Sequence, residues 1–175
     1  MTNLPNELFT DFQCFLVKYA MAVKKFIHTQ ILPVTPEEAW SFFSSPANLN
    51  DITPADMTFQ ITSGVPEKMY EGLIITYKVA PMLNIPLNWV TEITHVKEKE
   101  YFIDEQRQGP YRLRHHEHHF VKAEGGVQMT DLLYYDVGKW IFGRIASALF
   151  VDRRIRSIFA FREKKLKELF PEKPK

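Results

Sequence analysis

Histidine, acidic and arginine side chains crowd into one short stretch of this 175-residue chain. The stretch from Tyr101 to Phe120 reads YFIDEQRQGPYRLRHHEHHF, and Gly109-Pro110 divides it into two β-like runs. Because successive side chains of a strand point to opposite faces, alternate members of each run share a face. If that face is inward, the protein has a pocket with a polar floor. If it is outward, the protein has an ordinary solvated sheet.

Phe120 sets the two faces of the second run. If its ring points inward, every second residue before it shares that side: His118, His116 and Arg114. The residues between them then face away: His119, Glu117 and His115. The same alternation brings Asp104 and Gln106 to one side of the first run, together with Phe102.

A later β-like run adds one more acidic residue to the inward set. Asp131 falls among the apolar residues Met129, Leu133 and Tyr135. An apolar wall with a few placed polar groups is typical of a small-molecule pocket. The same side chains also suit a structural network, in which Asp131 orients a histidine and no ligand is involved.

Two further kinds of chemistry are open to the histidines. His116 or His118, coupled to Asp131, would titrate near neutrality and could move a proton on a carbonyl substrate. The His116-x-His118 spacing, completed by Asp131 or Asp104, would also suit a zinc-like site. Adjacent histidines on the outward face weaken the metal interpretation, and we expect neither a metal nor a cofactor.

Aromatic residues outside this stretch are further candidates for ligand contact. Tyr77 and Tyr135 are favoured because a buried phenol hydroxyl needs a hydrogen-bond partner. Trp89 either lines a cavity or fills the core, since large aromatic side chains dominate cores in general.

The elements that must position these residues follow from periodicity. Apolar residues alternate or run together in segments that we expect to be strands: 24–32, 58–62, 73–79, 87–96, 101–108, 112–122 and 127–136. Thr35-Pro36 with Glu38 is a helix start of the capping-box type, and residues 47–52 offer a second short helix. An apolar stripe of helical period from Ile141 to Leu169 predicts a long final helix. Asp152 and Arg162 are polar residues within that stripe.

Composition limits the class of protein. With 45% hydrophobic residues and a net charge of +1, the chain fits one domain with a real core, at residues 21–175. Residues 1–20 carry a helical stripe of their own and are expected to form an extension that packs on the domain or makes a homodimer. The single cysteine, Cys14, fits a reducing compartment, so we expect a cytoplasmic protein with no integral membrane segment.

The order of the predicted elements indicates an α+β fold. Short links between the strands favour an antiparallel meander, since parallel neighbours need long crossovers. We expect a curled antiparallel sheet of about seven strands around the long C-terminal helix, with two short helices after the first strand. Such a sheet, closed incompletely by a helix, tends to leave an internal cavity.

From Lys24 to Phe170 the chain resembles the START-like, or SRPBCC, superfamily, whose fold is the helix grip. It is most similar to a bacterial subgroup loosely labelled cell-division-inhibitor-like or polyketide cyclase/dehydrase-like. The spaced pattern that carries this resemblance is Phe102, Asp104, Gln106, Gly109, Pro110, His116, His118, Phe120 and Asp131. The subgroup usually has tryptophan where this chain has Arg114, so a charge replaces an aromatic wall there. The superfamily binds lipids, hormones, quinones and polyketides, and the resemblance therefore implies a cavity without naming its ligand.

The leading hypothesis is a soluble binding protein for a small, largely apolar molecule, a lipid, quinone or polyketide-like compound. The predicted ligand contacts are Tyr77, Trp89, Asp104, Gln106, Arg114, His116, His118, Phe120, Asp131 and Tyr135. One alternative is a cyclase- or dehydratase-like enzyme that uses a His/Asp pair. The other is an interaction protein that uses the N-terminal helix or the basic final helix, where residues 140–175 carry ten Lys and Arg against four Asp and Glu. A solvated helix face also explains that charge, and we expect no nucleic-acid partner.

Overall fold

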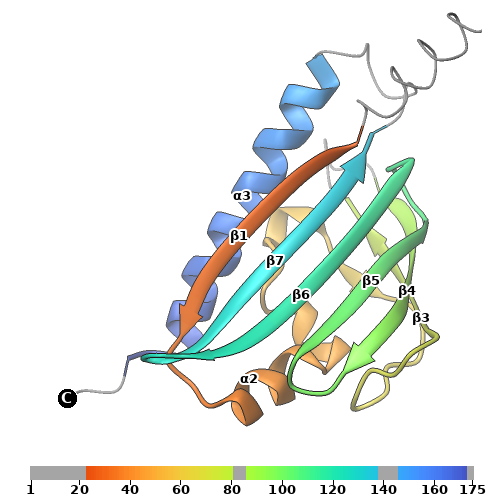
Figure 1. The fold of residues 1–175 in the computed structure, drawn as a ribbon. Coiled ribbons are helices and arrows are strands. Elements are labelled where there is room, and N and C mark those ends of the chain that lie inside the picture. The colour runs from red at the N-terminus through yellow and green to blue at the C-terminus, as the bar shows by residue number, and fades with distance from the viewer. Residues whose placement is uncertain (1–22, 81–85, 138–145, 173–175) are drawn as a thin grey trace, which may run out of the picture.

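Alternating burial along the strands gives the protein one covered sheet face. The structure is a computed structural model that describes residues 23–80, 86–137 and 146–172. Within these ranges the elements follow in this order (Figure 1): β1 (Lys24–Leu32), α2 (Pro36–Phe43), η1 (Pro46–Asn50), η2 (Ala55–Met57), β2 (Gln60–Ile61), β3 (Leu73–Val79), β4 (Leu87–Lys97), β5 (Tyr101–Gln108), β6 (Leu113–Ala123), β7 (Gly126–Asp136) and α3 (Ala146–Leu169).

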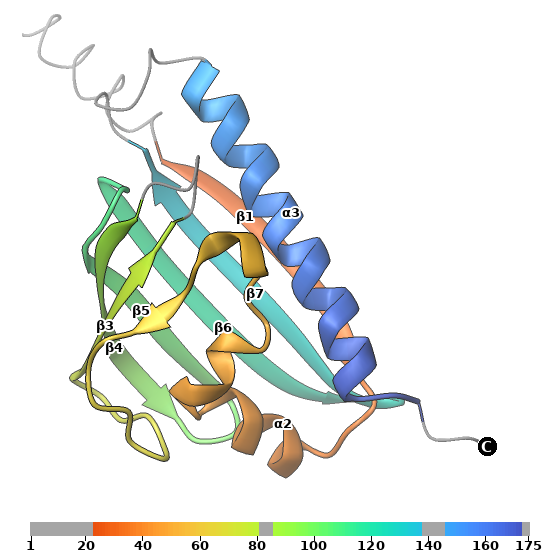
Figure 2. The same ribbon diagram turned by 180° about the vertical axis from the view of Figure 1, so that it is seen from behind.

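The strands form one antiparallel sheet in the order β1-β7-β6-β5-β4-β3-β2. From β2 to β7, strands that follow one another in sequence are neighbours, as a meander requires. β1 joins the far side of β7, where Lys24 lies opposite Tyr135 and Leu32 lies opposite Val127. The first and last strands of the described ranges are therefore paired. Figures 1 and 2 show the sheet curving toward the side on which α3 and α2 lie.

α2 begins where the capping box predicts. The side-chain oxygen of Thr35 accepts a hydrogen bond from the backbone N–H of Glu38 at 3.2 Å, and the Glu38 carboxylate accepts one from the backbone N–H of Thr35 at 2.8 Å. The helix buries Trp40, whose ring meets the rings of Phe102 and Phe120 edge-on. These contacts fix α2 against one end of the sheet.

α3 covers the concave face of the sheet with one apolar side. Ile155, Phe159 and Leu166 are buried, as the helical stripe predicts, and Val151 is buried beside them, whereas Leu169 at the end of the stripe is exposed. Phe159 meets the ring of Phe26 on β1 with 4.8 Å between centroids. Among the helices of the described ranges, none combines the length and the apolarity that a membrane span needs.

The predicted α+β helix grip is confirmed, and the local differences are small. The strand predicted over residues 58–62 is reduced to Gln60–Ile61, because Thr58 adopts a left-handed conformation with φ 44° that ends η2. The second short helix is a 3₁₀ helix that starts at Pro46, and η2 was not predicted. The N-terminal extension over residues 1–20 and the predicted first turn of the final helix lie outside the described residues.

Candidate functional site

A cavity of about 210 Å³ lies between the sheet and α3. Most of its wall is apolar and comes from every layer of the fold: Phe42, Phe43, Leu49, Ile52, Met57, Phe59, Met69, Ile75, Val79, Ile93, Phe102, Leu133, Val137, Val151, Ile155, Ile158 and Phe159. The polar part of the wall is small by comparison. Such a composition is typical of sites for small organic molecules.

The sequence prediction of faces is confirmed at the hairpin of β5 and β6. His116, His118 and Phe120 are buried, whereas the residues between them are partly exposed. Six of the ten predicted ligand-contact residues line the cavity: Tyr77, Trp89, Asp104, Arg114, His116 and His118. The other four lie outside its wall: Gln106, Phe120, Asp131 and Tyr135. Their role in binding stays a prediction.

Charged and histidine side chains at the cavity wall form a polar cluster: Asp104, Arg114, His116, His118 and Arg162, with Asp131 behind the wall. Arg114 is joined to two members of this cluster. One guanidinium nitrogen forms an ion pair with the Asp104 carboxylate, and Nη2 lies 3.0 Å from Nδ1 of His116. The guanidinium also lies over the ring of Trp89, 5.6 Å from its centroid. Arg114 therefore contacts an aromatic wall and supplies a counter-ion to Asp104.

His116 has its tautomer fixed by Arg114. A guanidinium can only donate, so Nδ1 of His116 must accept and its proton lies on Nε2. Nε2 is 3.2 Å from Oδ1 of Asp131 and donates to it. Burial lowers the pKa of His116, and the neighbouring His118 lowers it further, against the pull of the two aspartates. The His116 ring is therefore neutral.

His118 is held between two carboxylates. Its Nδ1 lies 2.7 Å from Oδ1 of Asp131, and its Nε2 lies 3.1 Å from Oδ2 of Asp104. Burial lowers the pKa of His118, but its interactions with Asp104 and Asp131 outweigh burial and raise the pKa above its ordinary value. Nε2 is hydrogen-bonded to Asp104, whereas Nδ1 faces Asp131 at close range without an aligned hydrogen bond, so the two carboxylates favour an imidazolium between them.

The two aspartates stay ionised within this cluster. Burial raises the pKa of the Asp104 carboxyl, but Arg114 and the two imidazoles outweigh it and hold the pKa well below its ordinary value. Burial raises the pKa of Asp131 in the same way, and the two imidazoles bring it below its ordinary value. Asp131 has no exposed surface. It therefore supports both histidines from behind the cavity wall.

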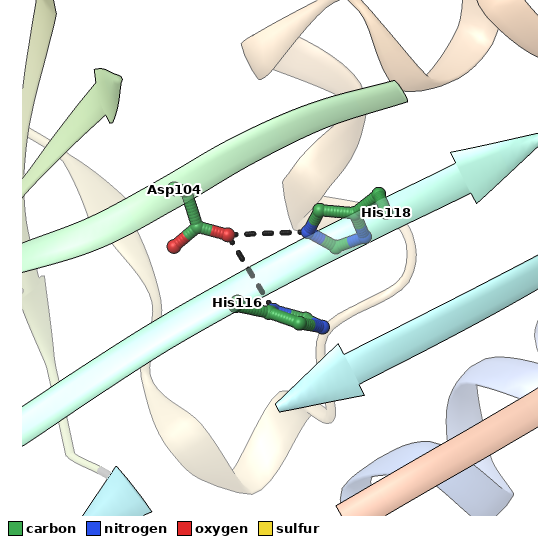
Figure 3. Close-up of side chains that lie close together, drawn as sticks. All are labelled: Asp104, His116 and His118. Atoms are coloured by element: carbon green, nitrogen blue, oxygen red, sulfur yellow. Dashed lines mark hydrogen bonds and ion pairs between the residues drawn. The ribbon is translucent and has the colours of Figure 1, made fainter. Parts of the chain in front are cut away.

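Asp104, His116 and His118 have the residue types of a metal site (Figure 3). Three of their ligand atoms lie within 4.8 Å of one another. Oδ2 of Asp104, however, already meets His118, and Nδ1 of His116 already accepts from Arg114. To bind Nδ1 of His116, a cation would have to displace the Arg114 guanidinium from that nitrogen. The geometry favours a hydrogen-bonded network over ligation.

Gln106 and Tyr135 serve neighbouring elements. The Gln106 side chain donates to the backbone carbonyl of Tyr111 at 2.6 Å and accepts from the Tyr111 backbone N–H at 3.3 Å, which ties the turn between β5 and β6 to β5. The Tyr135 hydroxyl donates to Asp152 of α3 at 2.6 Å. The same carboxylate also forms an ion pair with Lys24 at 2.6 Å. These two contacts explain why the apolar stripe of α3 contains a polar residue at Asp152.

Sequence reasoning missed three ionisable members of the cavity wall. Tyr111 follows the Gly109-Pro110 turn, and Arg154 and Arg162 come from α3. Arg154 pairs with Asp56 at 2.9 Å. The only signal in the sequence was the place of Arg162 on the apolar stripe of the final helix, where a solvated arginine is out of pattern.

Comparisons with known proteins bear on the fold. No protein-family model matches the sequence, and no curated protein does. Among solved structures, the di-domain ARO/CYC protein StfQ from the steffimycin biosynthetic pathway has a TM-score of 0.68 at 9% identity, covering 98% of this chain and 62% of its own. Protein CV1439 from Chromobacterium violaceum has a TM-score of 0.64 at 10% identity, covering 83% of this chain and 96% of its own. Major latex-like protein 151 from Panax ginseng has a TM-score of 0.61 at 12% identity, covering 85% and 98%.

These likenesses establish the class of fold. The chain has the helix-grip fold of START-like, or SRPBCC, proteins, with a hydrophobic cavity between the sheet and the C-terminal helix. At such low identities the fold alone is shown. The narrower resemblance to the bacterial subgroup stays a prediction.

Proposed function

We propose that the protein binds a small, largely apolar molecule, a lipid, quinone or polyketide-like compound, between the sheet and α3. The observation that carries this proposal is the cavity itself, an apolar space with one polar cluster at its wall. The polar cluster would orient the ligand, and the aromatic and aliphatic wall would supply most of the binding free energy. The description of StfQ as an ARO/CYC protein of a biosynthetic pathway agrees with a polyketide-like ligand.

The protonation states of His116 and His118 favour a role in ligand binding over a role in proton transfer. Each ring nitrogen of His116 and His118 already faces a partner within the protein. A general base needs a free lone pair within reach of the substrate. The cyclase- or dehydratase-like alternative would require this network to open first, and it predicts turnover that His118→Ala abolishes in a folded protein.

Native mass spectrometry of freshly purified protein tests the proposal. We expect a co-purifying small molecule, and we expect thermal stabilisation by at least one member of a panel of fatty acids, quinones and aromatic polyketides, since a ligand that binds only the folded state stabilises it. An empty protein that no member of the panel stabilises would contradict the proposal.

A matched pair of substitutions assigns the signal to the cavity. Ile158 lines the cavity from α3, and Ile158→Trp would fill part of it. Ile74 is 45% exposed on β3, so Ile74→Trp makes the same chemical change away from the cavity. We expect Ile158→Trp to lose the ligand and the thermal stabilisation, and Ile74→Trp to keep both. Equal retention by the two variants would place the ligand elsewhere.

A further inference from the structure

Among the described residues, no carboxylate comes within hydrogen-bonding distance of Arg162, unlike the other arginine of the polar cluster, Arg114. The Arg162 side chain projects from α3 into the cavity wall and is 11% exposed. The ring of Phe159, one turn earlier, lies 5.2 Å below its guanidinium. Burial lowers the pKa of Arg162, and Asp131 offsets that effect only in part. The guanidinium is still a cation, since arginine does not lose its proton in proteins.

The carboxylate nearest to Arg162 is shared among three partners. Nη1 of Arg162 lies 3.9 Å from Oδ1 of Asp131. The same oxygen lies 2.7 Å from His118 and 3.2 Å from His116, so the two imidazoles hold it more closely. Nε of Arg162 has no hydrogen-bond partner among the described residues. Arg114 differs, because it pairs directly with Asp104.

The charges of the cluster do not balance when His118 is an imidazolium. Two carboxylates, Asp104 and Asp131, face three cations, Arg114, Arg162 and His118. Arg154, elsewhere in the wall, is already paired with Asp56. A buried charge without a counter-ion is costly, so one negative charge in the cavity would be stabilising.

A second unpartnered donor points to the same ligand chemistry. Trp89 also lines the cavity, and its Nε1 has no partner in the part of the chain that the structure describes. An indole N–H and a guanidinium N–H can only donate, so both require acceptor atoms. A carboxylate offers acceptors and no donor, together with the missing negative charge.

We propose that the ligand is an organic anion, an apolar body that carries a carboxylate, and that Arg162 binds this group. The inference rests on the proposed function and names the chemistry of the ligand's polar end. Arg162 would form a charge-assisted pair with the carboxylate, while the body occupies the apolar wall.

Isothermal titration calorimetry at pH 7.5 with two matched probes tests the inference. The probes are 2-naphthoate and 2-acetylnaphthalene, which share the ring system and differ in a carboxylate against a methyl ketone. The wild-type protein is expected to bind the acid at least about tenfold more tightly, a difference of about 1.4 kcal/mol. Arg162→Met, which keeps the apolar stem and removes the charge, is expected to bind both probes alike.

The controls separate the charge of Arg162 from charge in general. Arg153 is exposed on the same helix, and Arg153→Met should keep the preference for the acid. Arg162→Lys should also keep most of it, because the cation remains. If thermal melts show that Arg162→Met does not fold, Arg162→Gln takes its place.

The outcomes distinguish the two proposals. Equal affinity of the wild-type protein for both probes, or an acid preference that survives the loss of the Arg162 charge, overturns the anion inference while the binding function stands. Binding of neither probe counts against the proposed function itself, and the anion inference fails with it.

Discussion

The two cavity-side histidines differ in charge although they lie two residues apart on one strand. Arg114 donates to His116 and so excludes a proton from Nδ1, whereas two carboxylates attract a proton to each nitrogen of His118. Their rings are 3.9 Å apart between centroids, so a charge on one opposes a charge on the other. Position relative to Arg114 therefore decides which ring carries the proton.

The raised pKa of His118 predicts how stability depends on pH. Its ordinary pKa is 6.5, and its folded pKa lies above that value, so the stabilisation is complete below pH 6.5 and is lost as pH rises through the folded pKa. His116 acts in the opposite sense and only below pH 6.5, because its folded pKa is lowered. Above pH 6.5 we expect the free energy of unfolding, measured with urea, to fall by up to about 1.4 kcal/mol per pH unit.

His118→Gln should remove this decline, and His95→Gln, at an exposed position, should keep it. A profile for His118→Gln that still parallels the wild-type profile between pH 6.5 and 8.5 would contradict the assignment of the charge to His118.

Asp131 is predicted to make a large contribution to the free energy of unfolding, although it does not line the cavity. Asp131→Asn removes the negative charge that holds both imidazoles and leaves His118 with one carboxylate. Losing one partner of a buried ion pair costs about 3 kcal/mol or more. Urea unfolding at pH 7 measures the loss, and Asp51→Asn at an exposed site serves as the control. A change as small as that of the control would show that Asp131 is dispensable.

The residues of the cluster were predictable where strand alternation decides their direction. Asp104, His116 and His118 needed only the period of two and one inward aromatic ring on each strand, Phe102 for Asp104 and Phe120 for the two histidines. Gln106 shares that face by period, yet its amide bonds with the backbone of Tyr111, because the turn at Gly109 brings that segment back within reach. Arg162 could not be assigned to the cluster, since its approach to Asp131 depends on how α3 crosses the sheet.

At the scale of elements, the junction between β1 and the β6–β7 hairpin depends on one glycine. Gly126 has φ +141°, and a Cβ there would lie 2.0 Å from the backbone oxygen of Leu32. No side chain fits without moving β1. Gly126→Ala is therefore expected to lower the free energy of unfolding by about 1–3 kcal/mol.

Gly64→Ala is the matched control, because a Cβ at Gly64 meets nothing within 4 Å. Thermal or urea unfolding of the two variants gives the comparison. Equal stability would mean that β1 adjusts freely at this junction.

One physical reason explains which helices and strands could be predicted from the sequence and which could not. Long strands and the final helix bury whole faces, so their period is repeated many times and can be read locally. The segment from Pro46 to Met57 packs through single residues such as Ile52 and Met57. Because this segment has no repeated period, its helical character was predictable but its 3₁₀ geometry and the extra turn η2 were not.

Across the whole molecule, a ligand would be felt most by the segments that close the cavity. The segment with η1 and η2 contributes Leu49, Ile52 and Met57 to the wall. β7, by contrast, is paired on both sides, with β1 and β6. Hydrogen exchange followed by mass spectrometry should therefore show slow exchange in β7 throughout, and ligand-dependent slowing in residues 46–57. Uniform slowing in all elements would instead indicate global stabilisation with no local closure.

The pairing of β1 with β7 also sets an order in time. Lys24 leaves the ribosome long before Tyr135, its partner in the sheet. Until then β1 is an unpaired edge with half-buried and exposed apolar residues, and such edges associate with other chains. Contacts between residues far apart in sequence are slow to form. The binding space is thus completed only after α3 has been synthesised, and nascent chains that lack α3 are expected to need protection from aggregation.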